Sequence, residues 1–162
     1  MSINEDHIEN NEKQIQDLYK SLLESWNKNN ATDFAKLFTK EGSTVGFDGS
    51  QLDGQLQIEK ELSRIFSEHK VASYIGIVRE IRQLSSSVYL LRAVAGMIPP
   101  GQNEINPKIN AIQTLVAQKG ENEFKISIFQ NTPAAFHGRP EASLQLTTEL
   151  QEAFNNQQKN DV

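Results

Sequence analysis

The sequence contains no cysteine, only one tryptophan, and no apolar run near the roughly 20 residues of a membrane span. Without cysteine the chain has no disulfide framework, thiol nucleophile or thiolate zinc site. Positive charge is also scarce: 16 Lys and Arg stand against 21 Asp and Glu, and the net charge of −5 argues against a nucleic-acid groove. The acidic, polar start lacks the basic and apolar regions of a secretion signal. We therefore expect a cytoplasmic protein that binds neither nucleic acid nor membrane.

The 162 residues suit a single domain, and the N-terminal half carries helical spacing. Steps of three and four residues place six large apolar side chains on one stripe of a first helix: Ile15, Leu18, Tyr19, Leu22, Leu23 and Trp26. Shorter patterns predict helices over 31–38, with Asn30 as N-cap, and over 55–69. The expected organisation is a flexible start over 1–10, a domain over 11–141, an amphipathic C-terminal helix over 142–155 and a flexible tail over 156–162.

Beyond residue 70 the apolar period falls to two, which predicts β-strands. Four stretches rich in Val, Ile, Tyr and Phe are separated by short polar breaks: 71–84, 87–98, 108–118 and 123–132. Breaks this short allow antiparallel hairpins and exclude helical crossovers. A further short strand over 44–48 turns at Asp48-Gly49. The pattern predicts an α+β domain, a cone in which helices cover one face of a curved antiparallel sheet and leave a cavity at the open end.

The motif FQNT at 129–132 ends an aromatic strand within the segment 124–141. This segment resembles the C-terminal signature of the SgcJ/EcaC family, in the SnoaL-like branch of the nuclear transport factor 2-like superfamily. The stretch 78–101 is similar to that family's central hairpin, and the resemblance covers roughly residues 10–141. It implies a nuclear transport factor 2-like (cystatin-like) cone, with three helices of the N-terminal half on one face. Some members are labelled oxidoreductases, but this sequence has neither a G-x-G-x-x-G motif nor a P-loop, so we expect no cofactor.

Strand parity predicts which polar side chains share a face of the sheet. If the numbers of paired residues add up to an odd number, Arg92, Gln113 and Gln130 project to the same side of the sheet. There they either orient a polar or anionic ligand in the cavity or pair across a dimer interface. Asn131 lies on the other side, either as a pocket amide that fixes a ligand carbonyl or as a cap of the strand end. Tyr74 shares that side, where its phenol either polarises a carbonyl or packs with the hydroxyl at the edge.

Three further residues are candidates for the mouth of the cavity. Trp26 ends the first apolar stripe and serves either as a roof of the cavity or as part of the core. Asp48 is a candidate general base and equally a turn residue before Gly49. His137 is placed at the rim beside Arg139. No histidines are spaced as a metal pair and no carboxylate cluster accompanies them, so we expect no metal site.

These features give a leading hypothesis and two alternatives. The leading one is a small-molecule-binding or accessory protein with a pocket inside the cone, because the strands offer amides and Arg but no evident catalytic pair. It acts as a homodimer through the sheet, since helices cover only one of two apolar faces. The first alternative is an isomerase-, dehydratase- or cyclase-type enzyme for a carbonyl or polyketide-like substrate, with Asp48 or His137 as base and Tyr74 as electrophile. The second is an oligomerisation domain.

Overall fold

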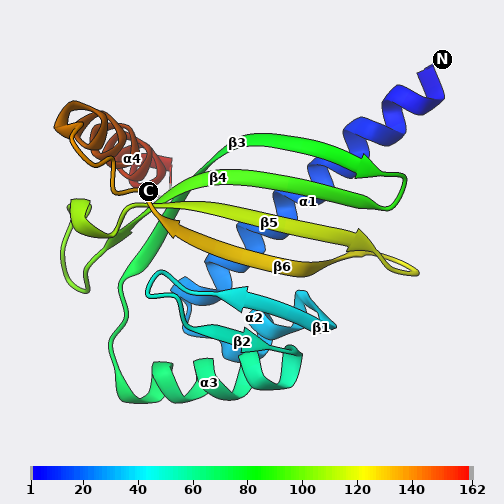
Figure 1. Cartoon of the computed structure of the whole chain (residues 1–162), viewed down its shortest axis with the longest axis horizontal. Helices are drawn as coiled ribbons and strands as arrows, with labels where there is room; N and C mark the ends of the chain where they lie inside the picture. The colour runs from blue at the N-terminus through cyan, green and yellow to red at the C-terminus, as the bar shows by residue number, and fades with distance from the viewer. Residues whose placement is uncertain (1, 161–162) are drawn as a thin grey trace.

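One curved sheet of six strands, in the order β2-β1-β6-β5-β4-β3, organises the chain (Figure 1). The computed structural model describes residues 2–160; residue 1 of the predicted start and residues 161–162 of the predicted tail lie outside the described part. The strands are β1 (Phe38–Val45), β2 (Gln51–Asp53), β3 (Ser73–Ser85), β4 (Val88–Ile98), β5 (Ala111–Lys119) and β6 (Phe124–Pro133). The helices are α1 (Ser2–Asn27), α2 (Ala31–Lys36), α3 (Gln55–Glu68) and α4 (Pro140–Asn160), with a short 3-10 turn at Pro107–Ile109.

The four long strands form the antiparallel series that the sequence predicts, with β3 beside β4, β4 beside β5 and β5 beside β6. The pairing of β3 with β4 shifts register between Val78 and Glu80 and again between Gln83 and Ser85. The pairing of β5 with β6 shifts between Val116 and Ala117. Such irregularities bend a strand and increase its local twist, so they help to curve the sheet into the wall of a cone.

Strand β1 departs from the antiparallel prediction, because it lies beside β6 and runs parallel to it. It also begins at Phe38, well before the predicted start at residue 44. Helical spacing predicts that Phe38 belongs to the second helix, but α2 ends at Lys36. Phe38 instead begins β1, and its ring is buried in the core. Asn30 caps α2 as predicted, since its side-chain oxygen accepts a hydrogen bond from the Asp33 amide at 2.9 Å.

The first and last helices are longer than their apolar stripes predict. Helix α1 includes residues 2–10, where the sequence predicts a flexible start, and α4 runs through Asn160, past the predicted end at residue 155. Residues 2–10 include two Glu and two Asn, residues 156–160 include two Gln, one Lys and two Asn, and neither extension carries a continuous apolar stripe. Glu, Gln and Lys are good helix formers, so backbone propensity extends a helix where hydrophobic periodicity gives no signal.

Helices α1, α2 and α3 cover one face of the sheet, here called the inner face, and α4 covers one end of the opposite, outer face (Figure 1). The stripe of α1 and the inner face form the main core, with these strand residues fully or almost fully buried: Tyr89, Leu91, Ala93, Leu115, Ala117, Ile126 and Phe129. On the outer face, α4 buries Leu146 and Leu150 in a smaller cluster. The Arg79 guanidinium ties β3 to α4 through a bidentate pair with Glu149, at 2.5 and 2.6 Å.

Gly76 allows α1 to approach β3 closely. A Cβ atom built on Gly76 would overlap the Tyr19 hydroxyl and lie 2.8 Å from Cδ1 of Leu23. The Tyr19 hydroxyl does not move aside freely, because it donates a hydrogen bond to the buried Gln113 at 2.6 Å. The position therefore requires a residue without a side chain.

The substitution Gly76→Ala is expected to lower the free energy of unfolding by about 1–3 kcal/mol, the usual cost of an overpacked core. Urea denaturation measures the change. Gly46→Ala is the matched control, since its added Cβ would lie 3.4 Å from the Asp48 carboxylate, in ordinary contact. Tyr19→Phe combined with Gly76→Ala should recover part of the loss, because it removes the overlapping hydroxyl. A loss no larger than that of Gly46→Ala would contradict the close approach.

Candidate functional site

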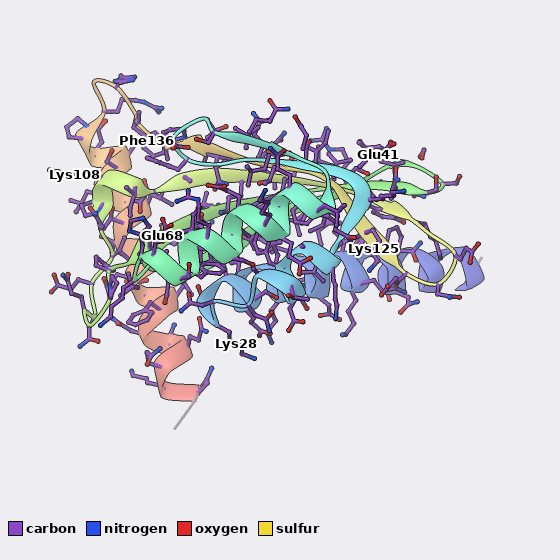
Figure 2. The ribbon with its side chains drawn as sticks, turned by 90° about the horizontal axis from the view of Figure 1, so that it is seen from below. Lys28, Glu41, Glu68, Lys108, Lys125 and Phe136 are labelled. Atoms are coloured by element: carbon purple, nitrogen blue, oxygen red, sulfur yellow. The ribbon has the colours of Figure 1, made fainter. Side chains whose placement is uncertain are left out.

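A cavity of about 450 Å³ lies between the inner face of the sheet and helices α1, α2 and α3. In the view of Figure 2, α3 lies across the front of the sheet, with Glu68 near its end. The wall is mainly aromatic and aliphatic, and its principal members are Leu23, Trp26, Phe34, Thr44, Phe47, Leu52, Leu62, Ile65, Tyr74, Met97, Phe129 and Asn131. The mouth carries Asp48, Ser50, Glu61 and Arg64. Of the eight residues predicted for the site, Trp26, Asp48, Tyr74 and Asn131 line this cavity.

Trp26 joins the core to the cavity wall. Its indole N–H donates to the carbonyl of Ala72 at 2.9 Å, so the polar edge of the ring is already paired. Its ring centroid lies 5.2 Å from that of Phe66 and 5.3 Å from that of Tyr74. Since the N–H is used internally, Trp26 offers a ligand an aromatic surface and no hydrogen bond.

Four groups from four elements form a continuous hydrogen-bond chain, here called the amide relay. The Tyr19 hydroxyl of α1 donates to Oε1 of Gln113 at 2.6 Å, and Nε2 of Gln113 donates to Oδ1 of Asn131 at 2.9 Å. Nδ2 of Asn131 donates to the backbone carbonyl of Val45 in β1 at 3.2 Å. Gln113 is fully buried and Asn131 is 7% exposed. The relay satisfies two amides that would otherwise be costly to bury in an apolar wall.

The relay corrects the predicted faces. Strand parity predicts that Gln113 shares a face with Arg92 and Gln130, but in the structure Gln113 lies opposite Ala93 of β4 and Asn131 of β6, on the inner face. The prediction assumes that the numbers of two paired residues add up to an odd number. Between β5 and β6 this holds only beyond the shift at Val116/Ala117, and between β4 and β5 the numbers of paired residues add up to an even number. One residue of register reverses every side chain of a strand, so the error moved Gln113 to the wrong side.

Arg92 and Gln130 lie on the outer face, away from the cavity. Arg92 pairs with Glu80 at 2.8 Å, and Glu80 also accepts from Arg82 at 3.0 Å. Hydrogen bonds from Arg82, with the nearby charge of Arg92, lower the pKa of the Glu80 carboxyl. Gln130 is exposed. The predicted convergence of Arg92, Gln113 and Gln130 inside the cavity is therefore wrong.

The Asp48 carboxylate closes the turn between β1 and β2 at the cavity mouth. Its two oxygens accept from the backbone N–H of Ser50 at 2.9 Å and from the Ser50 hydroxyl at 3.0 Å. These hydrogen bonds lower the pKa of Asp48, and the side chain is exposed. Because an exposed carboxylate with a lowered pKa is a weak proton acceptor, the geometry favours the turn role over that of general base.

Glu61 and Arg64 complete the charged mouth from α3. Arg64 forms a hydrogen-bonded ion pair with Glu61 and a second one with Glu68 at 2.7 Å. The hydrogen bond from Arg64 lowers the pKa of the Glu61 carboxyl. At the mouth, the charge of Arg64 is thus compensated by Glu61 and Glu68, and the Asp48 carboxylate is held by Ser50.

His137 lies in the loop that follows the last strand. It is exposed in the loop between β6 and α4, next to Phe136, whose φ of 43° is in the left-handed region. Its predicted neighbour Arg139 places its guanidinium 5.3 Å from the centroid of the Phe136 ring. The residues that line the cavity do not include His137, and its predicted place at the rim stays a prediction.

Tyr19 is the member of the amide relay that the sequence does not indicate, because its place in the apolar stripe of α1 predicts only core packing. Among the described side chains, those of residues 9–160, no group of three or more His, Asp or Glu residues is arranged as a metal site. In the same part of the chain, none of the helices combines the length and apolarity needed to cross a membrane.

Comparison with known proteins identifies the fold. No protein-family model and no curated protein matches the chain. Among solved structures, a domain of unknown function with a cystatin-like fold from Nostoc punctiforme superposes with a TM-score of 0.74. It is 23% identical to this chain, and the match covers 88% of this chain and 95% of that one.

Two further solved structures carry functional names. A putative scytalone dehydratase from Novosphingobium aromaticivorans matches at 14% identity with a TM-score of 0.62, over 75% of this chain and 83% of that one. A putative calcium/calmodulin-dependent protein kinase type II association domain from Thiobacillus denitrificans matches at 6% identity with a TM-score of 0.63, over 72% and 91%. At these identities the likeness shows the fold, and the predicted nuclear transport factor 2-like, cystatin-like cone is confirmed.

The phenol of Tyr74 gives a direct test of the cavity wall. Burial raises its pKa from the ordinary value of 10 to about 12, so the neutral phenol is the form that the folded protein stabilises. That stabilisation is complete below pH 10 and is lost as the pH rises through about 12. We expect Tyr74→Phe to remove an ultraviolet phenolate step near pH 12 and to flatten the alkaline loss of stability. Removal of a step near pH 10 would contradict the burial of this phenol.

Proposed function

We propose that the chain is a small-molecule-binding protein whose binding site is the cavity inside the cone. The observation that carries the proposal is an apolar cavity of about 450 Å³ with a buried amide, Asn131, in its wall. Ligand sites span roughly 300–1,000 Å³ and combine apolar walls with a few fixed polar groups. Asn131, Tyr74 and Thr44 supply polar groups in the wall, and Trp26 supplies aromatic surface.

Binding accounts for the wall better than acid–base catalysis does. Among the described residues that line the cavity there is no histidine, and the carboxylates Asp48 and Glu61 are at the mouth with lowered pKa values. An efficient general base has a pKa near the working pH and lies within hydrogen-bond reach of its substrate. The putative scytalone dehydratase among the structural neighbours keeps an enzyme of the dehydratase type as the alternative, with Tyr74 as its electrophile.

Placement in the SgcJ/EcaC family belongs to the same proposal and rests on the motif at 129–132. Its alternating residues Phe129 and Asn131 line the cavity, which gives the motif a role in the proposed site.

A homodimer through the outer face is the second part of the proposal. Helix α4 covers only one end of that face, and the remainder carries an apolar group formed by Leu90, Val116 and Ile128, of which Ile128 is 44% exposed. An apolar patch on an open sheet favours a partner, and a two-fold axis would set the same patch against itself. The kinase-type association domain among the structural neighbours supports an oligomer.

Filling the cavity tests the binding site. Thr44 lines the cavity from β1, and Thr44→Phe adds a ring where a ligand would lie. We expect it to weaken binding of the neutral fluorophore N-phenylnaphthylamine by at least about tenfold in a fluorescence titration. Thr132→Phe, at an exposed position of β6 outside the cavity wall, is the matched control and should leave the affinity unchanged. Equal affinities for both variants, or no binding by the unmodified protein, would overturn the proposed site.

Charge on the outer face tests the dimer. Ile128→Lys places two like charges near each other across a two-fold interface, which costs several kcal/mol. Sedimentation equilibrium at micromolar concentration should then show a dimer for the unmodified protein and a monomer for the variant. Leu56→Lys, at an 80% exposed position of α3, is the control and should remain dimeric. A monomeric unmodified protein would refute the dimer without affecting the cavity.

A further inference from the structure

The direction of the amide relay is set at its β1 end. The carbonyl of Val45 is only an acceptor, so Asn131 must turn its Nδ2 toward it and its Oδ1 toward Gln113. Gln113 must then donate through Nε2, which turns its Oε1 toward Tyr19, and the Tyr19 hydroxyl must donate. Rotating either amide would set two acceptors or two donors against each other. The backbone carbonyl of Val45 sets the direction of the relay, and the hydrogen bond from Tyr19 to Gln113 holds both amides in that orientation.

This direction decides which side of Asn131 meets a ligand. Thr44 and Gly46, on either side of Val45, line the cavity, whereas Gln113 and Tyr19 do not. The cavity is therefore on the Nδ2 side of the amide, and the Oδ1 side is turned to the closed part of the wall. An amide nitrogen carries two hydrogens, and the relay uses one of them. The second hydrogen is the group that Asn131 can offer to a ligand.

Tyr74 adds a second donor in the same wall. No hydrogen bond joins its hydroxyl to another described residue, and burial keeps the phenol neutral well above pH 7. The phenol O–H is thus present under physiological conditions. Asn131 and Tyr74 thus give the mainly apolar wall two hydrogen-bond donors, in addition to the hydroxyl of Thr44.

The charged residues indicate a neutral ligand. Asp48, Glu61 and Arg64 lie at the mouth, where each is already hydrogen-bonded to another protein group. No described Lys, Arg or His lines the deeper wall. A buried anion without a cation partner is strongly disfavoured, so an anionic ligand head would not be held there.

We infer that the cavity binds uncharged, mainly apolar compounds through a carbonyl oxygen, which accepts hydrogen bonds from Asn131 and Tyr74. Tyr19 and Gln113 are positioning residues: they touch no ligand, but they hold the Asn131 amide with its nitrogen toward the cavity. This inference rests on the proposed binding function and specifies the ligand class.

Three probes of similar shape separate the contribution of the carbonyl oxygen to the affinity from that of the apolar body. They are methyl naphthyl ketone, the alcohol formed by its reduction, and isopropenylnaphthalene, in which a methylene replaces the oxygen. Their affinities are measured by displacement of N-phenylnaphthylamine. The unmodified protein should bind the ketone roughly fivefold more tightly than the hydrocarbon, the effect of one net hydrogen bond. The ketone should also bind more tightly than the alcohol.

Variants then assign the preference to the relay. Asn131→Leu keeps the approximate shape and removes the donor, so it should abolish the preference for the ketone while the hydrocarbon still binds. Tyr19→Phe frees the Gln113 amide to rotate and should reduce the preference. Tyr89→Phe is the matched control, since Tyr89 is also fully buried on the inner face but its hydroxyl accepts from Asn11 and is outside the relay.

The outcomes distinguish the two proposals. Ketone preference that falls in Asn131→Leu and Tyr19→Phe, but not in Tyr89→Phe, supports the inference. Equal affinity for ketone and hydrocarbon, or a preference for the alcohol, overturns it and leaves the binding cavity intact. Loss of affinity for all three probes in equal measure in Tyr19→Phe refutes the positioning role. No binding of any probe by the unmodified protein overturns the binding function itself.

Discussion

The pairing of buried amides is the constraint on which the inner wall of the cone depends. An unpaired amide in this wall would cost roughly 1–3 kcal/mol, so each polar atom of the relay requires its partner in place. The partners come from α1, β5, β6 and β1, through Tyr19, Gln113, Asn131 and Val45. The seating of α1 on the sheet and the parallel pairing of β1 with β6 therefore support one another. Gly76 belongs to the same arrangement, because the Tyr19 hydroxyl occupies the space of its absent side chain.

The same arrangement divides the cavity into two chemical zones. In the interior, aromatic and aliphatic side chains surround neutral hydrogen-bonding groups, among them Asn131 and Tyr74. At the mouth, charged groups such as Asp48 and Arg64 are exposed and held by neighbouring hydrogen bonds. Burial raises the pKa of Tyr74, whereas hydrogen bonding lowers that of Asp48. Both shifts move the pKa of the group further from pH 7. Such groups suit the recognition of a neutral molecule better than proton transfer.

The sequence predicts the elements and the fold class, but not which side chains meet. Hydrophobic periodicity locates the four long strands within a few residues, since their apolar alternation reflects burial on each face. The assignment of Gln113 to the face of Gln130 fails because the register shift at Val116/Ala117 has no signature in the composition, and the β4–β5 register, which places Gln113 opposite Ala93, separates it from Arg92. The partnership of β1 with β6 also escapes prediction, since it joins segments more than 80 residues apart and no turn links them.

Strand β6 shows why the two proposed surfaces constrain each other. Phe129 and Asn131 line the cavity, while Ile128 and Gln130, between them in the chain, lie on the outer face. Because side chains alternate along a strand, inserting or deleting one residue here would move the amide out of the cavity and an outer residue into it. The spacing of this segment is therefore fixed by both faces at once. A variant that keeps the pocket residues of β6 but shifts their register would lose the relay, and it would alter the apolar group on the outer face at the same time.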